Sequence, residues 1–261
     1  MAEQTIRFDD GAAYERMMGA WSRLVGIAFL DWLDVPRGAR WVDVGCGNGA
    51  FTELLAQRTA PACIEALDPS EGQIAFALKR EAASPARFRQ GDAMDLPFDD
   101  GAFDAAVMAL VLFFVPDPRK GLAELVRVVR PGGLVCAYMW DMPGGGLPLQ
   151  PIYDGLTAMK VPAPSPPHPE VSTVPAMRQM WEEAGLTGIE TRVISVRRDF
   201  DSFQDYWEAC LSGHLGAAVR GMPPDAAADL RRRVEAGFPQ AGTGPMAHTG
   251  VANAIRGRKP A

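Results

Sequence analysis

The chain has 261 residues, 48% of them hydrophobic, 22% charged and 8% aromatic, with a formal net charge of −6. This composition is typical of a globular protein rather than a disordered one, and the length allows one large domain or two small ones. The acidic balance disfavours nucleic acid as a partner, and the longest apolar run, residues 105–115, is far shorter than the roughly 20 residues of a membrane-spanning helix.

The N-terminus carries no apolar stretch behind a basic start, so no secretory or transit signal is predicted and we expect a cytoplasmic protein without a membrane segment. The four cysteines are widely spaced and lie near none of the three histidines. This spacing predicts neither a disulfide framework nor a metal site. The sequence leaves monomer and homodimer equally open.

Strand-like and helical segments alternate through the first half of the chain. Apolar residues recur at helical spacing over 21–33, and helical patterns also follow each of the first two expected strands and the cap at Asp117. Ser70 and Gln73 have the spacing of a capping box, which predicts a helix as far as about residue 82. The alternation predicts parallel crossovers and a doubly wound α/β sheet. The expected strands cover residues 41–44, 63–67, 88–90, 103–115 (extending into an apolar loop) and 134–140.

In the second half of the chain, strand-like and helical segments alternate less regularly, although we expect one domain overall. Helical patterns cover 151–159, 177–184, a stretch from Asp201 and 225–236, and strands are expected over 189–196 and about 247–255. We expect two insertions to form a cap over the carboxyl ends of the strands, where ligands of open α/β sheets bind. The expected units are a helical cover (1–40), the core (41–141), a cap insertion (142–173), a core helix and strand (174–200), a second cap insertion (201–245) and a last strand with its tail (246–261).

The strongest chemical signal is the stretch Val-Asp-Val-Gly-Cys-Gly-Asn-Gly-Ala at 42–50, in which a strand turns through three glycines into a helix. Such a turn admits a ligand against bare backbone. The glycines alone also satisfy a relaxed dinucleotide fingerprint, so they do not identify the ligand. Asp43 discriminates between the two kinds of ligand, because its carboxylate repels a pyrophosphate and attracts the ammonium group of an amino-acid ligand.

Two further acidic residues follow the next two strands. Asp68 ends the second strand, where an acidic side chain can accept both hydroxyl groups of a ribose. Asp92 ends the third strand and can accept a hydrogen bond from the exocyclic amine of adenine. The alternatives are a helix cap for Asp68 and an Asx turn for Asp92. Adenine, ribose and an ammonium group together describe S-adenosylmethionine (SAM).

With these residues the sequence resembles the class I SAM-dependent methyltransferases, in particular a small-molecule branch. The matching motifs are Asp-x-Gly-x-Gly-x-Gly at 43–49, Gly-Asp-Ala at 91–93, Leu-Pro-Phe-x-Asp at 96–100 and Arg-Pro-Gly-Gly at 130–133. The resemblance implies a Rossmann-like sheet of seven strands, mostly parallel, with a final antiparallel strand. It also implies a product, S-adenosylhomocysteine (SAH).

The resemblance also implies roles for residues around the cofactor. Gly45, Gly47 and Gly49 are expected to line the methionine moiety, with Asp68 at the ribose and Asp92 at the adenine. The other residues expected to border the cofactor are Tyr14, Trp21, Ser22, Asp43, Cys46, Asn48, Pro69, Gln73, Gly91, Ala93 and Met108.

The chain departs from its relatives after the fourth strand. Many relatives carry Leu-His-His there, whereas this chain has Leu112-Phe113-Phe114, so no histidine base is expected at that position. The Asn/Asp-Pro-Pro-Tyr/Phe signature of enzymes that methylate amino groups of nucleic acids is also missing. The second absence agrees with the acidic charge of the chain, which disfavours nucleic acid as a partner.

The leading hypothesis is methyl transfer to a small, apolar or aromatic metabolite. A SAM-fold protein that does not methylate, such as a cyclase or a binding module, is the alternative, and Asp43 disfavours a NAD-dependent oxidoreductase. The candidate general base is His214, which follows a cap helix, although a surface histidine is the competing interpretation. The candidate acceptor contacts, for which core packing is the alternative, are Tyr153, Phe203, Tyr206 and Trp207.

Overall fold

The computed structural model describes the whole chain except residues 1–14, 34, 36, 81–85 and 239–243. Its strands form one sheet of seven in the order β3-β2-β1-β4-β5-β7-β6. β7 is antiparallel to both of its neighbours, and the other neighbouring strands are parallel. The predicted doubly wound sheet is therefore confirmed. The strands are β1 (Arg40–Val44), β2 (Cys63–Asp68), β3 (Ala86–Gln90), β4 (Phe103–Ala109), β5 (Val129–Trp140), β6 (Thr187–Phe200) and β7 (Met246–Arg258).

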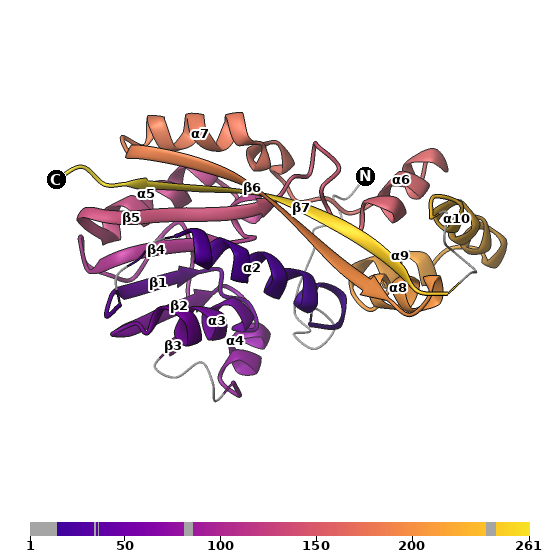
Figure 1. Ribbon diagram of the computed structural model, residues 1–261, viewed down its shortest axis with the longest axis horizontal. Coiled ribbons are helices and arrows are strands. Elements are labelled where there is room, and N and C mark those ends of the chain that lie inside the picture. Colours follow the sequence, from indigo (N-terminus) through magenta and orange to yellow (C-terminus); the bar gives the residue numbers. More distant parts are fainter. Residues whose placement is uncertain (1–14, 34, 36, 81–85, 239–243) are drawn as a thin grey trace.

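Helices cover both faces of this sheet (Figure 1). Along β4, Ala105 and Val107 join a hydrophobic core with α2 and α3, whereas Ala106 and Met108 join a second core with α5 and α7. This division follows from the alternation of side chains along a strand. The helices in chain order are η1 (Glu15–Gly19, a π-helix), α2 (Ala20–Trp32), α3 (Ala50–Thr59), α4 (Glu71–Ala77), η3 (Leu112–Phe114), α5 (Pro118–Val128), α6 (Gln150–Ala158), η4 (Pro169–Ser172), α7 (Val174–Glu183), α8 (Phe203–Cys210), α9 (His214–Arg220) and α10 (Pro224–Ala236).

Helix starts follow the predicted caps. The Asp117 carboxylate accepts hydrogen bonds from the backbone N–H groups of Arg119 (3.1 Å) and Lys120 (3.0 Å), and Pro118 occupies the first helical position of α5. The Ser70 hydroxyl accepts from the N–H of Gln73 at 3.3 Å and begins α4. Each cap joins residues only two or three positions apart, which explains why the sequence alone predicted both helix starts.

Helix and strand ends differ more from the prediction. α4 ends at Ala77 instead of near residue 82, and beyond its end the Arg80 side chain donates to the carbonyl oxygen of Asn48 in the turn after β1. β5 begins at Val129 and includes the Pro-Gly-Gly stretch, since the backbone of Gly132 and Gly133 pairs with Lys259 beyond β7. The prediction also missed α9. The longer β5 depends on a contact with a distant part of the chain, which the local sequence does not reveal.

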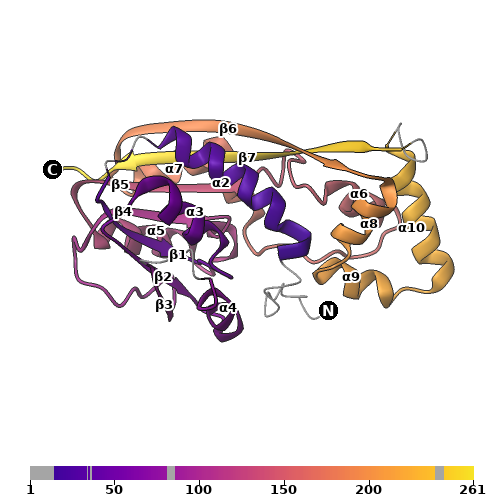
Figure 2. The same ribbon diagram turned by 60° about the horizontal axis from the view of Figure 1, so that its bottom comes forward.

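β6, predicted over 189–196, and β7, predicted over about 247–255, both extend past these bounds, and together they run beyond the sheet. β7 pairs with β5 only from Ala252 onward, whereas it pairs with β6 from Met246 opposite Phe200. The excess forms a two-stranded ribbon that carries a helical lobe, defined here as α6, α8, α9 and α10 (Figures 1 and 2). β6 runs in the direction of the parallel strands, so the lobe lies on the side of their carboxyl ends.

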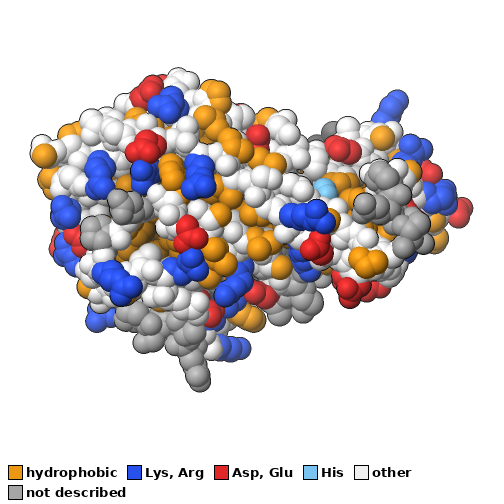
Figure 3. All heavy atoms as spheres, in the orientation of Figure 1, with side chains coloured by type: hydrophobic (Ala, Val, Ile, Leu, Met, Phe, Trp, Pro, Cys, Tyr) orange, Lys and Arg blue, Asp and Glu red, His pale blue; other side chains and the backbone are white. Residues whose placement is uncertain are grey.

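Acidic and basic side chains are interspersed over the face seen in Figure 3. Within the described part of the chain, no helix combines the length and the apolar character that crossing a membrane requires.

Candidate functional site

The turn between β1 and α3 presents bare backbone at the carboxyl end of the sheet. Gly45, Gly47 and Gly49 have φ angles of 78°, 53° and 79°, a region that L side chains rarely adopt. A Cβ atom at Gly45 would lie 2.4 Å from the Val111 side chain, whereas a Cβ at Gly47 would have nothing within 4 Å. Gly45 is therefore small because the protein packs against it, and Gly47 borders open space.

Asp68 joins the end of β2 to this glycine turn. Its Oδ2 accepts a hydrogen bond from the N–H of Gly47 at 2.9 Å, and its Oδ1 accepts from the N–H of Ser70 at 2.9 Å. Burial raises the pKa of Asp68, and the two backbone bonds oppose that rise. Each carboxylate oxygen keeps a lone pair for a further donor. The geometry therefore suits an acceptor for the hydroxyl groups of a ribose.

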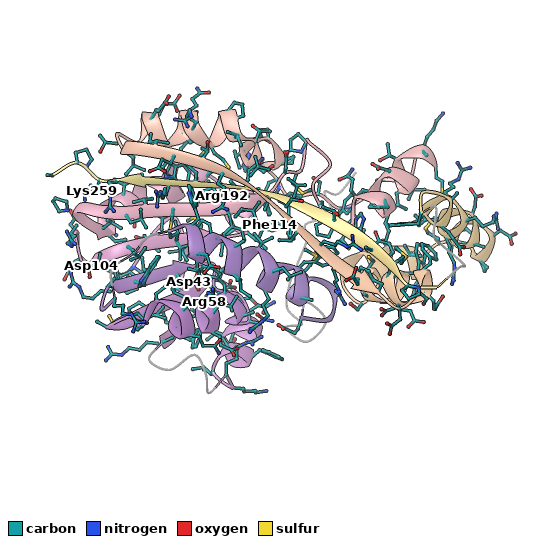
Figure 4. All side chains as sticks on the ribbon, viewed as in Figure 1. Asp43, Arg58, Asp104, Phe114, Arg192 and Lys259 are labelled. Atoms are coloured by element: carbon teal, nitrogen blue, oxygen red, sulfur yellow. The ribbon has the colours of Figure 1, made fainter. Side chains whose placement is uncertain are left out.

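Asp43 is a buried acid directly behind the turn (Figure 4). Its side chain is fully buried, its Oδ2 accepts a 2.6 Å hydrogen bond from the Thr52 hydroxyl, and its Oδ1 has no hydrogen-bond partner among the described residues. Burial raises the pKa of Asp43 to about 7; the Thr52 bond opposes the rise and the negative charge of Asp68 adds to it. A nearby cation would favour the charged form. The unpartnered oxygen and the open space at Gly47 fit a ligand with an ammonium group.

The loop after β3 holds Asp92 at the surface. Its Oδ1 accepts a hydrogen bond from the N–H of Met94 at 2.9 Å, which is the Asx turn that the sequence left open as an alternative. Gly91 and Ala93 are half-buried on either side. The second carboxylate oxygen of Asp92 can still accept from an amine, so its contact with adenine stays a prediction.

The structure brings only part of the remaining candidates to the glycine turn. Cys46 and Asn48 belong to the turn and are buried, and burial raises the pKa of the Cys46 thiol, which argues against a reactive thiolate. Pro69 and Gln73 follow Asp68 at the start of α4.

Four candidates lie away from the turn or outside the described structure. Met108 has no exposed surface, and its terminal methyl carbon would lie 3.5 Å from a Cβ built at Gly121 in α5. Trp21 and Ser22 are buried in α2, and Tyr14 lies outside the described residues. The predicted contacts of these residues with a cofactor stay untested.

The predicted acceptor contacts lie in the core of the helical lobe. Phe203, Tyr206 and Trp207 are buried, with Tyr206 fully so, and the Tyr206 hydroxyl donates to the carbonyl oxygen of Pro148 at 3.3 Å. Tyr153 is half-buried, and its hydroxyl donates to the carbonyl oxygen of Pro164 at 2.9 Å. The structure therefore shows packing roles for these side chains, and their contact with an acceptor stays a prediction.

Two histidines bear on the choice of a base. His214 is the first residue of α9, and its side chain lies outside the described part. His248, on β7, packs against Trp21 (ring centroids 5.9 Å apart), Tyr206 and Phe238 (both 5.4 Å). Burial lowers the pKa of His248 despite a hydrogen bond to the Pro148 backbone. The sequence did not single out His248, because its neighbours come from three distant segments.

Two more residues of the site escaped the sequence analysis. Arg80 donates from Nε to the carbonyl oxygen of Asn48 at 2.7 Å, and Glu15 accepts from the Asn48 amide at 2.9 Å. Glu15 and Arg80 are 65 positions apart and belong to no motif. No local signal could have found them.

Comparison with known proteins agrees with this geometry. A family model described as "Methyltransferase domain" matches residues 42–137. A demethylmenaquinone methyltransferase of Bacillus cytotoxicus is 30% identical over 177 residues, which are 61% of this chain and 75% of that protein. A fatty-acid O-methyltransferase of Mycolicibacterium smegmatis is 40% identical over 96 residues, which are 37% of this chain and 35% of that protein. The solved structure of the [4+2]-cyclase SpnF shares the fold, with a TM-score of 0.57 at 22% identity over 100% of this chain and 88% of that one.

The chain belongs to the class I SAM-dependent methyltransferases. This assignment confirms the predicted family and its cofactor, SAM. The chain spans only 29% to 49% of the length of several other curated relatives. The family model ends at residue 137, before the ribbon and the helical lobe, so it bears on the cofactor half of the site and not on the acceptor.

Proposed function

We propose that this protein transfers a methyl group from SAM to a small, largely apolar or aromatic acceptor held between the glycine turn and the helical lobe. The observation that carries the proposal is the set of three groups at the carboxyl ends of β1 and β2: open backbone at Gly47, the Asp68 carboxylate and the buried Asp43 carboxylate. β1 lies between β2 and β4, where the strand order reverses. Ligands of doubly wound sheets bind at such a reversal.

The residues present fit the cofactor in a specific arrangement. Gly45 to Gly47 and Asp43 would hold the methionine moiety, Asp68 would accept from the ribose hydroxyls, and Asp92 would accept from the adenine amine. When bound, SAM supplies a methyl group that its sulfonium has already activated. The chain's own residues then need to orient the acceptor and exclude water, which can supply most of the acceleration.

The composition of the helical lobe supports an apolar acceptor. Hydrophobic side chains on the lobe and the loop after α6 are only partly buried: Tyr153, Met159, Val161, Ala163, Leu211, Met222 and Phe238. The relatives named above act on demethylmenaquinone and on a fatty acid, and both acceptors are largely apolar. We therefore propose an acceptor of this chemical class. His214 remains the proposed base, and an acceptor that ionises by itself would need none.

Labelled SAM incubated with hydroquinones and with fatty acids tests the proposal. Formation of SAH together with a labelled acceptor is the expected result, and the Gly47→Val variant is the control for a blocked cofactor site. Tight SAM binding without SAH formation for any acceptor would contradict methyl transfer and favour the alternative, a cyclase or binding module on the same fold. Failure of the wild-type protein to bind SAM would contradict both.

A further inference from the structure

Arg80 forms hydrogen bonds to three segments that meet at the glycine turn: the turn itself, α3 and η1. Its Nε donates to the carbonyl oxygen of Asn48 at 2.7 Å, its Nη1 to Glu53 at 2.7 Å and its Nη2 to Glu15 at 2.8 Å. Its side chain is 17% exposed, and its Cδ would lie 3.3 Å from a Cβ built at Gly49. Since all three guanidinium nitrogens are engaged, the Arg80 side chain is fixed against the Asn48–Gly49 segment of the turn.

Glu15 completes this arrangement from the N-terminal side. One carboxylate oxygen, Oε2, accepts from both Arg80 and the side-chain amide of Asn48, the latter at 2.9 Å. The other Asn48 side-chain atom, Oδ1, accepts from the N–H of Ala50 at the start of α3 at 3.1 Å. Glu15 therefore contacts both Asn48 and Arg80 directly and orients both side chains.

The backbone conformation of η1 and a glycine at its end accommodate the Glu15 carboxylate. Glu15 begins η1, a π-helix, and such helices are rare and frequently mark functional sites. A Cβ at Gly19, the last residue of η1, would lie 2.7 Å from the Glu15 carboxyl carbon. Glycine at this position leaves room for the carboxylate of Glu15 beside the helix.

η1 also reaches the helical lobe. It contacts α8, and it continues into α2, where the Trp21 ring lies 6.2 Å from Phe200 and 5.9 Å from His248 between centroids. The segment that Glu15 ties to the glycine turn therefore bridges the cofactor half of the molecule and the lobe (Figure 2).

We propose that Glu15 is a positioning residue of the cofactor site: it holds η1 on the glycine turn through Asn48 and Arg80 and thereby keeps the bound cofactor from leaving. The inference rests on the proposed function. Loss of the Glu15 carboxylate would remove one hydrogen bond of the Asn48 amide and one of the Arg80 guanidinium, and with them these contacts between η1 and the turn. The cofactor should then escape faster, while the Asp43 and Asp68 contacts that bind it stay in place.

The test compares dissociation of SAH from the full-length protein and its variants by stopped-flow displacement. Glu15→Ala should raise the SAH dissociation rate about fivefold to thirtyfold, as expected for two partly exposed hydrogen bonds to a charged group. The KM for SAM should rise with it, while kcat at saturating SAM should stay within about twofold of wild type. Glu15→Gln keeps one acceptor oxygen and should recover part of the retention.

Asp31→Asn is the matched control. Asp31 pairs with Arg58 between α2 and α3 on the surface, at the end of α3 that lies away from the glycine turn, so its loss should not change SAH dissociation. Equal dissociation rates in wild type and Glu15→Ala, with both proteins equally stable to heat, would overturn the inference and leave the proposed function intact. If the wild-type protein bound neither SAM nor SAH, the proposed function and this inference would both be overturned. If Glu15→Ala did not fold, Glu15→Gln would decide by the same measurement.

Discussion

Replacing Asp43 by Asn should change the stability of the protein in opposite directions at low and high pH. Asp43 is fully buried, and its pKa of about 7 in the folded state compares with 3.8 for an ordinary aspartate. Between these values the folded state binds a proton that the unfolded state has released. The free energy of unfolding therefore falls as the pH rises from about 4 to about 7.

The size of this effect follows from the pKa. Each pKa unit corresponds to about 1.4 kcal/mol, so the charged form of Asp43 costs up to about 4 kcal/mol at pH 8. Asparagine removes the charge but places an amide N–H group where Oδ1 has no partner, which costs about 1 to 3 kcal/mol. Asp43→Asn should thus be more stable than wild type by about 1 to 3 kcal/mol at pH 8. Near pH 4.5 the charge on Asp43 costs wild type only about 1 kcal/mol, so the variant should be less stable there by up to about 2 kcal/mol.

Urea unfolding of both proteins at pH 4.5, 6 and 8 measures this change of sign. Asp104→Asn is the control, since Asp104 lies at the end of the sheet away from the lobe (Figure 4). Although burial acts to raise it, the pKa of Asp104 is lowered by hydrogen bonds from Arg130 and Arg40. A lowered pKa means that the charged form is stabilising above the unfolded value, so Asp104→Asn should destabilise at pH 8 and much less at low pH. A constant difference between Asp43→Asn and wild type at all three pH values would refute the reasoning.

The other predictions concern binding and turnover. Asp68→Ala should weaken SAM and SAH binding about tenfold to hundredfold by calorimetry, because a ribose would lose charge-assisted acceptors; unchanged affinity in a folded variant would remove that role. Gly47→Val should lose SAM binding because its side chain would fill the open space at the turn, and it should also lose about 1 to 3 kcal/mol of stability because a β-branched residue is strained at a φ of 53°. Gly45→Ala should lose about 1 to 3 kcal/mol of stability in urea unfolding because of its φ of 78° and its 2.4 Å contact with Val111; normal SAM binding by a folded Gly47→Val would contradict the open-backbone argument. His214→Ala should lower turnover about 10²- to 10⁴-fold without changing SAM affinity if His214 is the base, and a loss under about threefold would leave catalysis to proximity and desolvation.

The sequence by itself determined the elements that depend on neighbours in the chain. The caps at Ser70 and Asp117, the glycine turn and the alternation of strands with helices are all local patterns, and the structure has each of them. The acidic residues Asp43 and Asp68 were found because parallel strands bring their carboxyl ends to one edge of the sheet. Periodicity predicted the alternating α/β architecture, whereas the seven-stranded sheet with an antiparallel last strand was predicted from the family resemblance. The cofactor contacts of Asp43 and Asp68 stay predictions.

Only the tertiary structure decided how these groups are surrounded. The burial that raises the pKa of Asp43, the length of the β6–β7 ribbon and the packing of Tyr206 in the lobe all depend on residues far apart in the sequence. The Glu15–Arg80 contact joins positions 65 residues apart and belongs to no repeating pattern. Desolvation and long-range hydrogen bonds are properties of the packed molecule, because both depend on which distant atoms replace water around a group.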